Sequence, residues 1–462
     1  MNIGGLHRKH LLIVVAALAA GGTLALPVPA DTPSNVLPTL AITVFTVGLW
    51  ATGALAEYIT SLIFFGLAIG FSVAPPAVVF AGLTSSAFWL VVGGMVIGIA
   101  ADRTGLGRYL AHVFTRRLSA SYPQLIAGII IGAVALAFLL PSSMGRLVIL
   151  MPIVLGLADN LEFEVGSRGR TGMALAAALG TFYVPLTILP ANLPNVVLAG
   201  VADTLYDLHI TYGEYLLMHF PVTGVVKGGF LVVFLSFLFR SDIPNSNNTP
   251  SRQKLGHDGR RLAIILSFAL IGWASDFIHG VSPGWISICA AALCLMPKIG
   301  VLKPAHLKGT GGYQTLIYVA AILGVGAVIS TTGAGSFIAT EVLKVVSFAP
   351  GQPAQTYAAF SGLSMAFSTF STLPGMIAIL APFADQVADS SGLSIFVIMM
   401  MTVNGFSTLF LPYQSAPIMV GLRLGGVGIS TAAKVMLPLG ILTLILLQPL
   451  NYLWWSWLGY LG

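Results

Sequence analysis

Residues 141–146 read PSSMGR and separate two apolar runs, 124–140 and 147–158. Both runs are apolar enough for lipid, but each is short for an independent membrane span, which needs about 20 residues. Non-helical backbone at membrane depth is stable only when it is buried in protein or lines an aqueous cavity, because unsatisfied amides are costly in lipid. We therefore predict a re-entrant helical hairpin over 122–158, with a candidate binding site at its tip.

The composition places the whole chain in a bilayer. Of its 462 residues, 56% are apolar and only 8% are charged, whereas soluble domains carry about 25% charge. The mean hydropathy is +0.93. The net charge of +6 does not indicate nucleic-acid binding, because the basic residues lie in short connections between apolar runs. The two cysteines, Cys289 and Cys294, share one apolar run and are predicted to be packing residues.

The first 35 residues have two interpretations. The basic residues 7–10, followed by the apolar run 11–26, resemble a cleavable signal peptide. The interpretation that we favour is a retained first helix whose basic end lies in the cytoplasm.

The remaining chain divides into two halves of similar organisation. We predict an all-α polytopic membrane protein with about eleven transmembrane helices and two re-entrant hairpins. Proline pairs break one long span in each half, at 189–195 and 411–417, because proline cannot continue a regular helix. The predicted segments are a first repeat at 36–239 with its broken span at 171–200, a polar cytoplasmic linker at 240–261, and a second repeat at 262–462 with a hairpin at 355–388 and a broken span at 394–422.

The distribution of basic residues sets the predicted topology. If the N-terminus is cytoplasmic, all but three of the 21 Lys and Arg residues lie on cytoplasmic connections or at the cytoplasmic end of the first helix. The exceptions are Arg146, Lys227 and Lys344. Such asymmetry follows the positive-inside rule and predicts a multi-pass protein of the inner membrane.

The two halves also resemble each other in sequence. When Pro152 is placed over Pro382, residues 142–152 align with 372–382 and their glycines coincide. The two Leu-Pro pairs of the broken spans align in the same way. The span count gives the halves opposite orientations in the membrane. Inverted repeats with interrupted helices are typical of secondary transporters that bind their substrate near the midplane.

With these features the chain resembles the divalent-anion:sodium symporter family of dicarboxylate, citrate and sulfate carriers, over residues 36 to 458. In that family each hairpin tip reads Ser-Asn-Thr, where this chain has Ser142-Ser143-Met144 and Thr372-Leu373-Pro374. The resemblance implies an elevator mechanism, a homodimer and a small anionic substrate. From the resemblance and from the residues at the tips and breaks, we predict substrate binding by Ser142, Ser143, Arg146, Asn192, Asn195, Thr372, Gln414 and Ser415. It implies sodium binding by Ser142, Ser143, Ala191, Ser371 and Thr372, although Met144 and Leu373 lack the oxygens of the family motif.

The residues themselves also favour an anion. Helix N-termini at the tips and breaks present unpaired N–H groups and a positive dipole end. Arg146 adds a full charge, which costs about 2.5–3.5 kcal/mol at mid-membrane and usually faces a cavity or a partner. Two hypotheses are open: Arg146 faces the substrate as a fixed charge that replaces a bound cation, making transport an exchange or proton-coupled, or it pairs structurally with Asp385.

Other functions fit less well. A sodium/proton or inorganic oxyanion exchanger (sulfate or arsenite-like) is the alternative carrier, but an ion-for-proton exchanger needs carboxylates and the tips contain none. A channel is a further alternative, but two hairpin tips that approach one site from opposite faces favour alternating access by a carrier. The sequence contains no HExxH, Walker or Gly-x-Ser-x-Gly motif, so we predict that the protein is not an enzyme and has no cofactor other than transported sodium.

Overall fold

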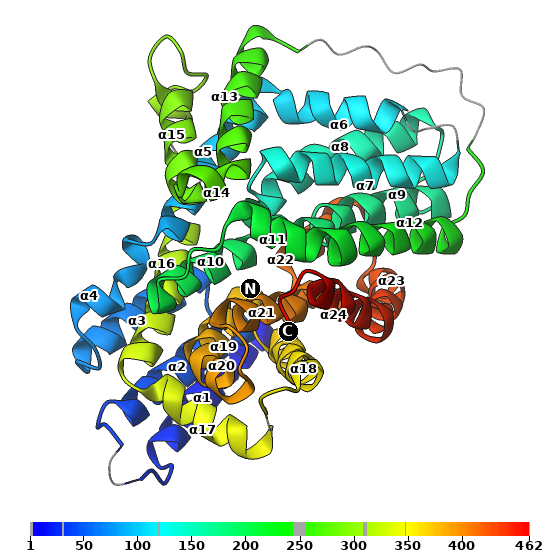
Figure 1. Cartoon of the computed structure of the whole chain (residues 1–462). Coiled ribbons are helices and arrows are strands. Elements are labelled where there is room, and N and C mark those ends of the chain that lie inside the picture. The colour runs from blue at the N-terminus through cyan, green and yellow to red at the C-terminus, as the bar shows by residue number, and fades with distance from the viewer. Residues whose placement is uncertain are drawn as a thin grey trace.

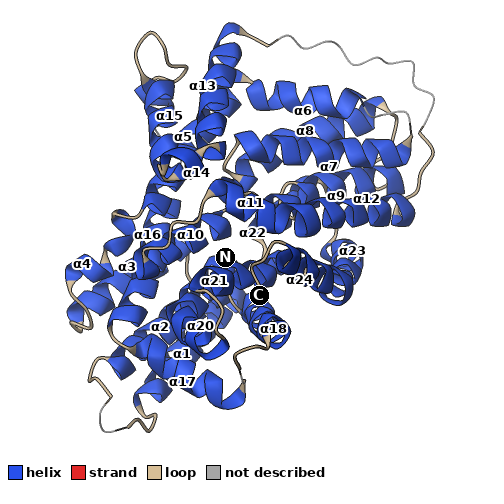
Figure 2. Cartoon of the chain, viewed as in Figure 1, coloured by secondary structure: helices blue, strands red, loops and turns tan. Residues whose placement is uncertain are grey.

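The computed structural model describes residues 3–29, 32–117, 121–243, 255–307, 312–346 and 348–461. Within these ranges all regular secondary structure is helical (Figure 2), which confirms the predicted all-α class. Of the predicted linker, residues 244–254 lie outside the described ranges. By length and composition, six described helices are suited to cross a membrane, namely 86–104, 122–139, 143–160, 212–238, 312–331 and 429–457. The full count of eleven spans stays a prediction.

One group of helices combines the beginning of each half. It contains α1 (Ile3–Leu24), α2 (Val36–Thr52), α3 (Glu57–Gly70), α5 (Ser86–Thr104), α13 (His257–Ala274), α15 (Pro283–Leu295) and α16 (Gly312–Thr331). Helix α5 packs along α15 and α16 packs along α3. The approach of α5 to α15 depends on glycine, because a Cβ at Gly284 would lie 2.0 Å from the Ser86 carbonyl oxygen. Small residues at such contacts let membrane helices approach closely.

A second group is stacked on one side of the molecule (Figure 1). Its members are α6 (Leu106–Arg117), α7 (Tyr122–Leu139), α8 (Ser143–Asn160), α9 (Arg168–Gly180) and α12 (Lys227–Leu238). The tip between α7 and α8 is formed by the non-helical residues 140–142. Helix α8 begins at Ser143 because the Ser142 hydroxyl accepts a hydrogen bond from the Gly145 N–H at 3.1 Å. This N-cap satisfies one of the free amides of the first turn.

The second half contains a helical pair with the same cap. Helix α18 (Pro353–Phe370) is followed by α19 (Leu373–Leu380) and, after one short 3₁₀ turn, by α20 (Ala384–Ser391). The Thr372 hydroxyl accepts from the Gly375 N–H at 3.2 Å. Both tips therefore use a hydroxyl cap followed three residues later by glycine. The alignment of the two halves predicts the matching glycines but not the caps.

Each broken span consists of two helices joined by a segment with one or two 3₁₀ turns. The first comprises α9 and α10 (Leu193–Tyr206), and the second comprises α21 (Ile395–Ser407) and α22 (Ala416–Leu424). The second helix of each span packs on the other half of the chain: α10 contacts α19, and α22 contacts α8 and α9. This reciprocal packing joins the broken span of each half to the hairpin of the other half.

A π-helical turn interrupts one long helix in each half. Residues Phe220–Val226 form it between α11 (Tyr212–His219) and α12, and residues Thr443–Leu447 form it between α23 (Ile429–Leu442) and α24 (Gln448–Trp457). The first residue after the π turn is Lys227 in one half and Gln448 in the other. Such turns occur frequently at functional sites.

Candidate functional site

Arg146 lies at the centre of the first half and is completely buried. Its Nη1 donates to the carbonyl oxygens of Leu140 at 2.6 Å and Ala191 at 2.8 Å. Its Nη2 donates to the Thr181 carbonyl at 2.9 Å and to Asn192 Oδ1 at 3.0 Å. The guanidinium therefore joins the hairpin tip to both sides of the first break.

These acceptors explain how the charge is tolerated. Leu140 caps the C-terminus of α7 and Thr181 caps that of α9, and the C-terminal end of a helix carries a partial negative charge. Asp385 is not among the partners of Arg146; its carboxylate accepts from the Gln386 N–H at 2.9 Å. The two Nη atoms are thus satisfied by backbone carbonyls and one amide rather than by a carboxylate, whereas the buried Nε has no hydrogen-bond partner among the described residues.

Lys227 holds the corresponding position at the second break. Its side chain is buried, and its Nζ donates to the Ser407 carbonyl at the C-terminal end of α21. The ammonium also lies 4.6 Å from the centre of the Tyr183 ring, a favourable cation–π geometry. Among the described residues, the ion pairs of the structure involve neither Arg146 nor Lys227.

Tyr183 connects the two breaks directly. It lies in the first break, and its hydroxyl donates to the Leu409 carbonyl in the second at 2.9 Å. The two interrupted spans, more than 200 positions apart along the chain, therefore meet through Tyr183 and Lys227. Sequence reasoning missed Tyr183 because no local signal marks a tyrosine that bonds so distant a carbonyl.

The predicted amide residues of the breaks mainly hold their own backbone. Asn195 Nδ2 donates to the Ile188 carbonyl at 2.8 Å. Gln414 Oε1 accepts from the N–H groups of Phe410 and Leu411, both at 2.8 Å. Asn192, Asn195, Gln414 and Ser415 are all buried. Their packing fixes the shape of the breaks.

The residues at the tips are less buried than those of the breaks. Ser142, Ser143, Ser371 and Thr372 are all partly exposed, and Met144 is 40% exposed. Thr372 Oγ1 accepts from the Tyr318 hydroxyl at 3.2 Å, whereas Ser371 Oγ is itself buried and has no hydrogen-bond partner among the described residues. Hydroxyl groups thus lie at both tips, beside the N-terminal ends of α8 and α19.

Three of the predicted sodium ligands are already engaged. The Ala191 carbonyl accepts from Arg146, and the hydroxyls of Ser142 and Thr372 cap helices. A cation at the first break would have to compete with the guanidinium for the same oxygens.

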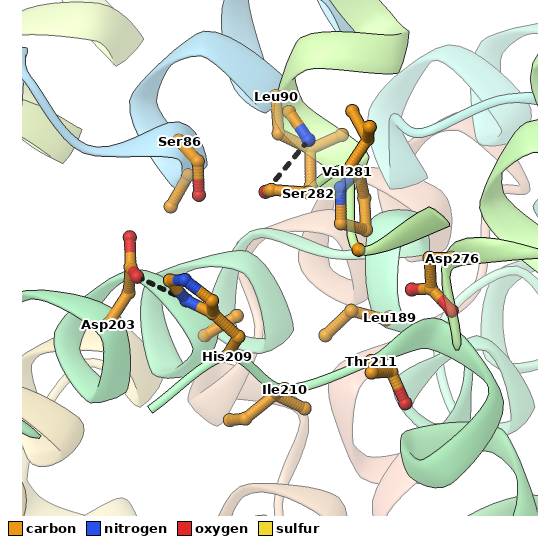
Figure 3. Close-up of a pocket in the computed structure, with 15 residues that line it drawn as sticks. Ser86, Leu90, Leu189, Asp203, His209, Ile210, Thr211, Asp276, Val281 and Ser282 are labelled. Atoms are coloured by element: carbon orange, nitrogen blue, oxygen red, sulfur yellow. Dashed lines mark hydrogen bonds and ion pairs between the residues drawn. The ribbon is translucent and has the colours of Figure 1, made fainter. Parts of the chain in front are cut away.

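A separate pocket of about 110 Å³ lies between α5, α10 and α15 (Figure 3). Asp203 pairs there with His209 at 2.6 Å, and Asp276 accepts from the Tyr212 N–H at 2.6 Å. Burial raises the pKa of Asp276, because a charged carboxylate is poorly solvated there. The lining includes neither tip, but Leu189 of the first break contributes to it.

Comparison with known proteins supports a transport role. A family model described as the sodium:sulfate symporter transmembrane region matches residues 7–461. A membrane protein of Cupriavidus necator is 25% identical over 97% of this chain and 93% of its own length. The L-tartrate/succinate antiporter of Shigella sonnei is 21% identical over 81% of this chain and 79% of its own length.

The fold is also shared with a solved structure. The YdaH transporter of Alcanivorax borkumensis matches over 99% of both chains, with a TM-score of 0.56 and 16% identity. At this identity the likeness concerns the fold alone.

The contact between the breaks can be tested by Tyr183→Phe. The substitution leaves the buried Leu409 carbonyl without its partner, which should cost about 1–3 kcal/mol and lower the melting temperature in detergent. Tyr413→Phe is the matched control, because Tyr413 lies in the second break but is 58% exposed. Equal melting temperatures for the two variants would contradict the assigned role of Tyr183.

Proposed function

The chain belongs to the divalent-anion:sodium symporter family of membrane anion transporters, and from this premise we propose that it is an elevator-type secondary carrier for a small dicarboxylate. As a family member it is a transporter and not an enzyme. The observation that carries the proposal is the meeting of the two breaks, where Tyr183 of the first half bonds Leu409 of the second.

The arrangement of helix ends supports an anion at the centre. Helices α8, α10, α19 and α22 all begin at a tip or a break, and helix N-termini favour negative charge. The reciprocal packing of α10 and α22 on the opposite hairpins supports an inverted repeat with two re-entrant hairpins among eleven spans. In this proposal the protein lies in the cytoplasmic membrane as a homodimer with its N-terminus inside.

Two separated groups of hydroxyls favour a substrate with two carboxylates. We assign one carboxylate to Ser142 and Ser143 at the first tip and the other to Ser371 and Thr372 at the second. The printed name of the Shigella sonnei relative, L-tartrate/succinate antiporter, agrees with a C4 dicarboxylate. Sulfate is the second candidate, because the matching family model is described by it.

Counterflow decides between these substrates. Purified protein in liposomes loaded with unlabelled succinate should accumulate external labelled succinate transiently, and external tartrate should suppress this accumulation. If sulfate suppresses it and tartrate does not, the oxyanion alternative is correct. No accumulation of labelled succinate or sulfate above protein-free liposomes would refute both substrate assignments.

Ser143→Ala tests the assigned contact at the first tip. Loss of one hydroxyl bond to a carboxylate should raise the succinate KM about tenfold, equivalent to about 1.4 kcal/mol, with the melting temperature unchanged. Ser430→Ala, an exposed serine remote from both tips, is the control. An unchanged KM for Ser143→Ala would remove this residue from the site.

A further inference from the structure

The pocket between α5, α10 and α15 has an acidic lining. Its volume is about 110 Å³. Among the described residues that line it, Asp203, His209 and Asp276 can carry charge, and none is lysine or arginine. Carboxylates that line a small pocket without a neutralising basic side chain attract cations. The pocket therefore favours a positively charged ligand, unlike the proposed anion site at the tips.

The chain reversal after α10 gathers three metal-binding side chains on one wall. Asp207 ends α10 in a left-handed conformation with φ +50°, and the Leu208 N–H donates to the Ala202 carbonyl at 3.2 Å. This turn returns His209 to Asp203, whose carboxylate lies 2.6 Å from the imidazole (Figure 3). Ligand atoms of Asp203, Asp207 and His209 all lie within 4.8 Å of one another.

Asp276 lies on the opposite wall and supplies an independent indication of a ligand. It begins α14 (Asp276–His279), the short helix between α13 and α15. The residue is 3% exposed, and its Oδ2 accepts from the Tyr212 N–H at 2.6 Å. Its Oδ1 is buried without a hydrogen-bond partner among the described residues. Figure 3 shows the carboxylate in the pocket, across from Asp203. A buried acceptor without a donor is costly, and a hydrated cation would satisfy it.

The type of cation follows from the ligand set. Zinc binds imidazole nitrogen together with carboxylate oxygen, whereas magnesium and calcium prefer oxygen ligands alone. The side chains of Asp203 and His209 are 23% and 67% exposed, so an ion from the solution can reach them. One imidazole and two carboxylates on an accessible wall therefore favour zinc.

We propose that this pocket is an inhibitory zinc site whose protein ligands are Asp203, Asp207 and His209. A water molecule completes the coordination and donates to Asp276 Oδ1. Three protein ligands and one water form a common arrangement for zinc. The two carboxylates of the first wall neutralise the charge of the ion.

Inhibition follows from the helices that the ion joins. A carrier exposes its site alternately by moving one group of helices against another. Helix α10 belongs to the first broken span, whereas α14 connects α13 and α15 in the group that combines the beginning of each half. A zinc ion that links the end of α10 to α14 would hold the two groups in one orientation. The inhibition rests on the proposed carrier function, but zinc binding does not.

Melting temperature tests zinc binding without transport. Zinc chloride should raise the melting temperature of the detergent-solubilised protein, because an ion that binds only the folded state stabilises it. EDTA should reverse the effect, and magnesium chloride at the same concentration should not reproduce it. A melting temperature indifferent to zinc, or raised equally by magnesium, would overturn the proposal.

His209→Gln tests the imidazole ligand. The zinc concentration for half-maximal stabilisation should rise at least about tenfold in this variant. His257→Gln is the matched control, because His257 is also exposed and lies 4.0 Å from Asp258, yet it belongs to no group of three metal-binding side chains among the described residues. Equal zinc responses of the two variants would remove His209 from the site.

Asp276→Asn tests the contact across the pocket. Asparagine keeps an oxygen for the Tyr212 N–H but removes the charge and the second acceptor. Loss of such an outer contact should weaken zinc binding about tenfold or more. Unaltered zinc affinity in Asp276→Asn would exclude Asp276 from the site.

Succinate counterflow tests the inhibition. Zinc chloride on both sides of the liposome membrane should stop most of the counterflow, and EDTA should restore it. His209→Gln should retain counterflow at zinc concentrations that stop it in the unmodified protein. Zinc binding with unaltered counterflow would overturn the inhibitory role. Absence of succinate counterflow in zinc-free buffer would count against the proposed substrate instead, and the melting temperatures would still decide whether zinc binds.

Discussion

The structure depends on how the carbonyl groups at its interrupted helices are satisfied. An apolar chain can contain non-helical backbone at its centre only if every exposed amide finds a partner. Here the C-terminal ends of α9 and α21 face buried cations, and the N-terminal ends of α8 and α19 are capped by Ser142 and Thr372. The same interruptions that form the proposed anion site therefore also hold buried positive charge beside it.

This arrangement couples the two halves of the chain. Arg146 joins the first tip to the first break, whereas Lys227 and Tyr183 join the first half to the second break. Helix α10 of the first half also packs on α19 of the second, and α22 of the second half packs on α8 and α9 of the first. A substrate held at the tips would thus lie within one connected unit, as movement of a loaded site as a rigid body requires.

Local sequence signals predicted much of this framework. Proline pairs marked both breaks, and the alignment of the two halves paired the glycines of both tips. These features follow from the chemistry of neighbouring residues. The partners of the buried charges could not be predicted in this way. Lys227 bonds a carbonyl 180 positions away, and Arg146 bonds backbone oxygens at three separate helix ends. Backbone carbonyls carry no residue-specific signal. The sequence therefore suggested the acidic residue Asp385 as a partner of Arg146 instead.

The proposed function depends on the binding of a dicarboxylate between the interrupted helices of the two halves. The most direct measurement is the melting temperature of the detergent-solubilised protein with and without succinate, for the unmodified chain and for Ser143→Ala. We expect succinate to raise the melting temperature of the unmodified protein and to raise that of Ser143→Ala less, because a ligand that binds only the folded state stabilises it. A melting temperature that is indifferent to succinate, tartrate and sulfate would contradict the proposed carrier function.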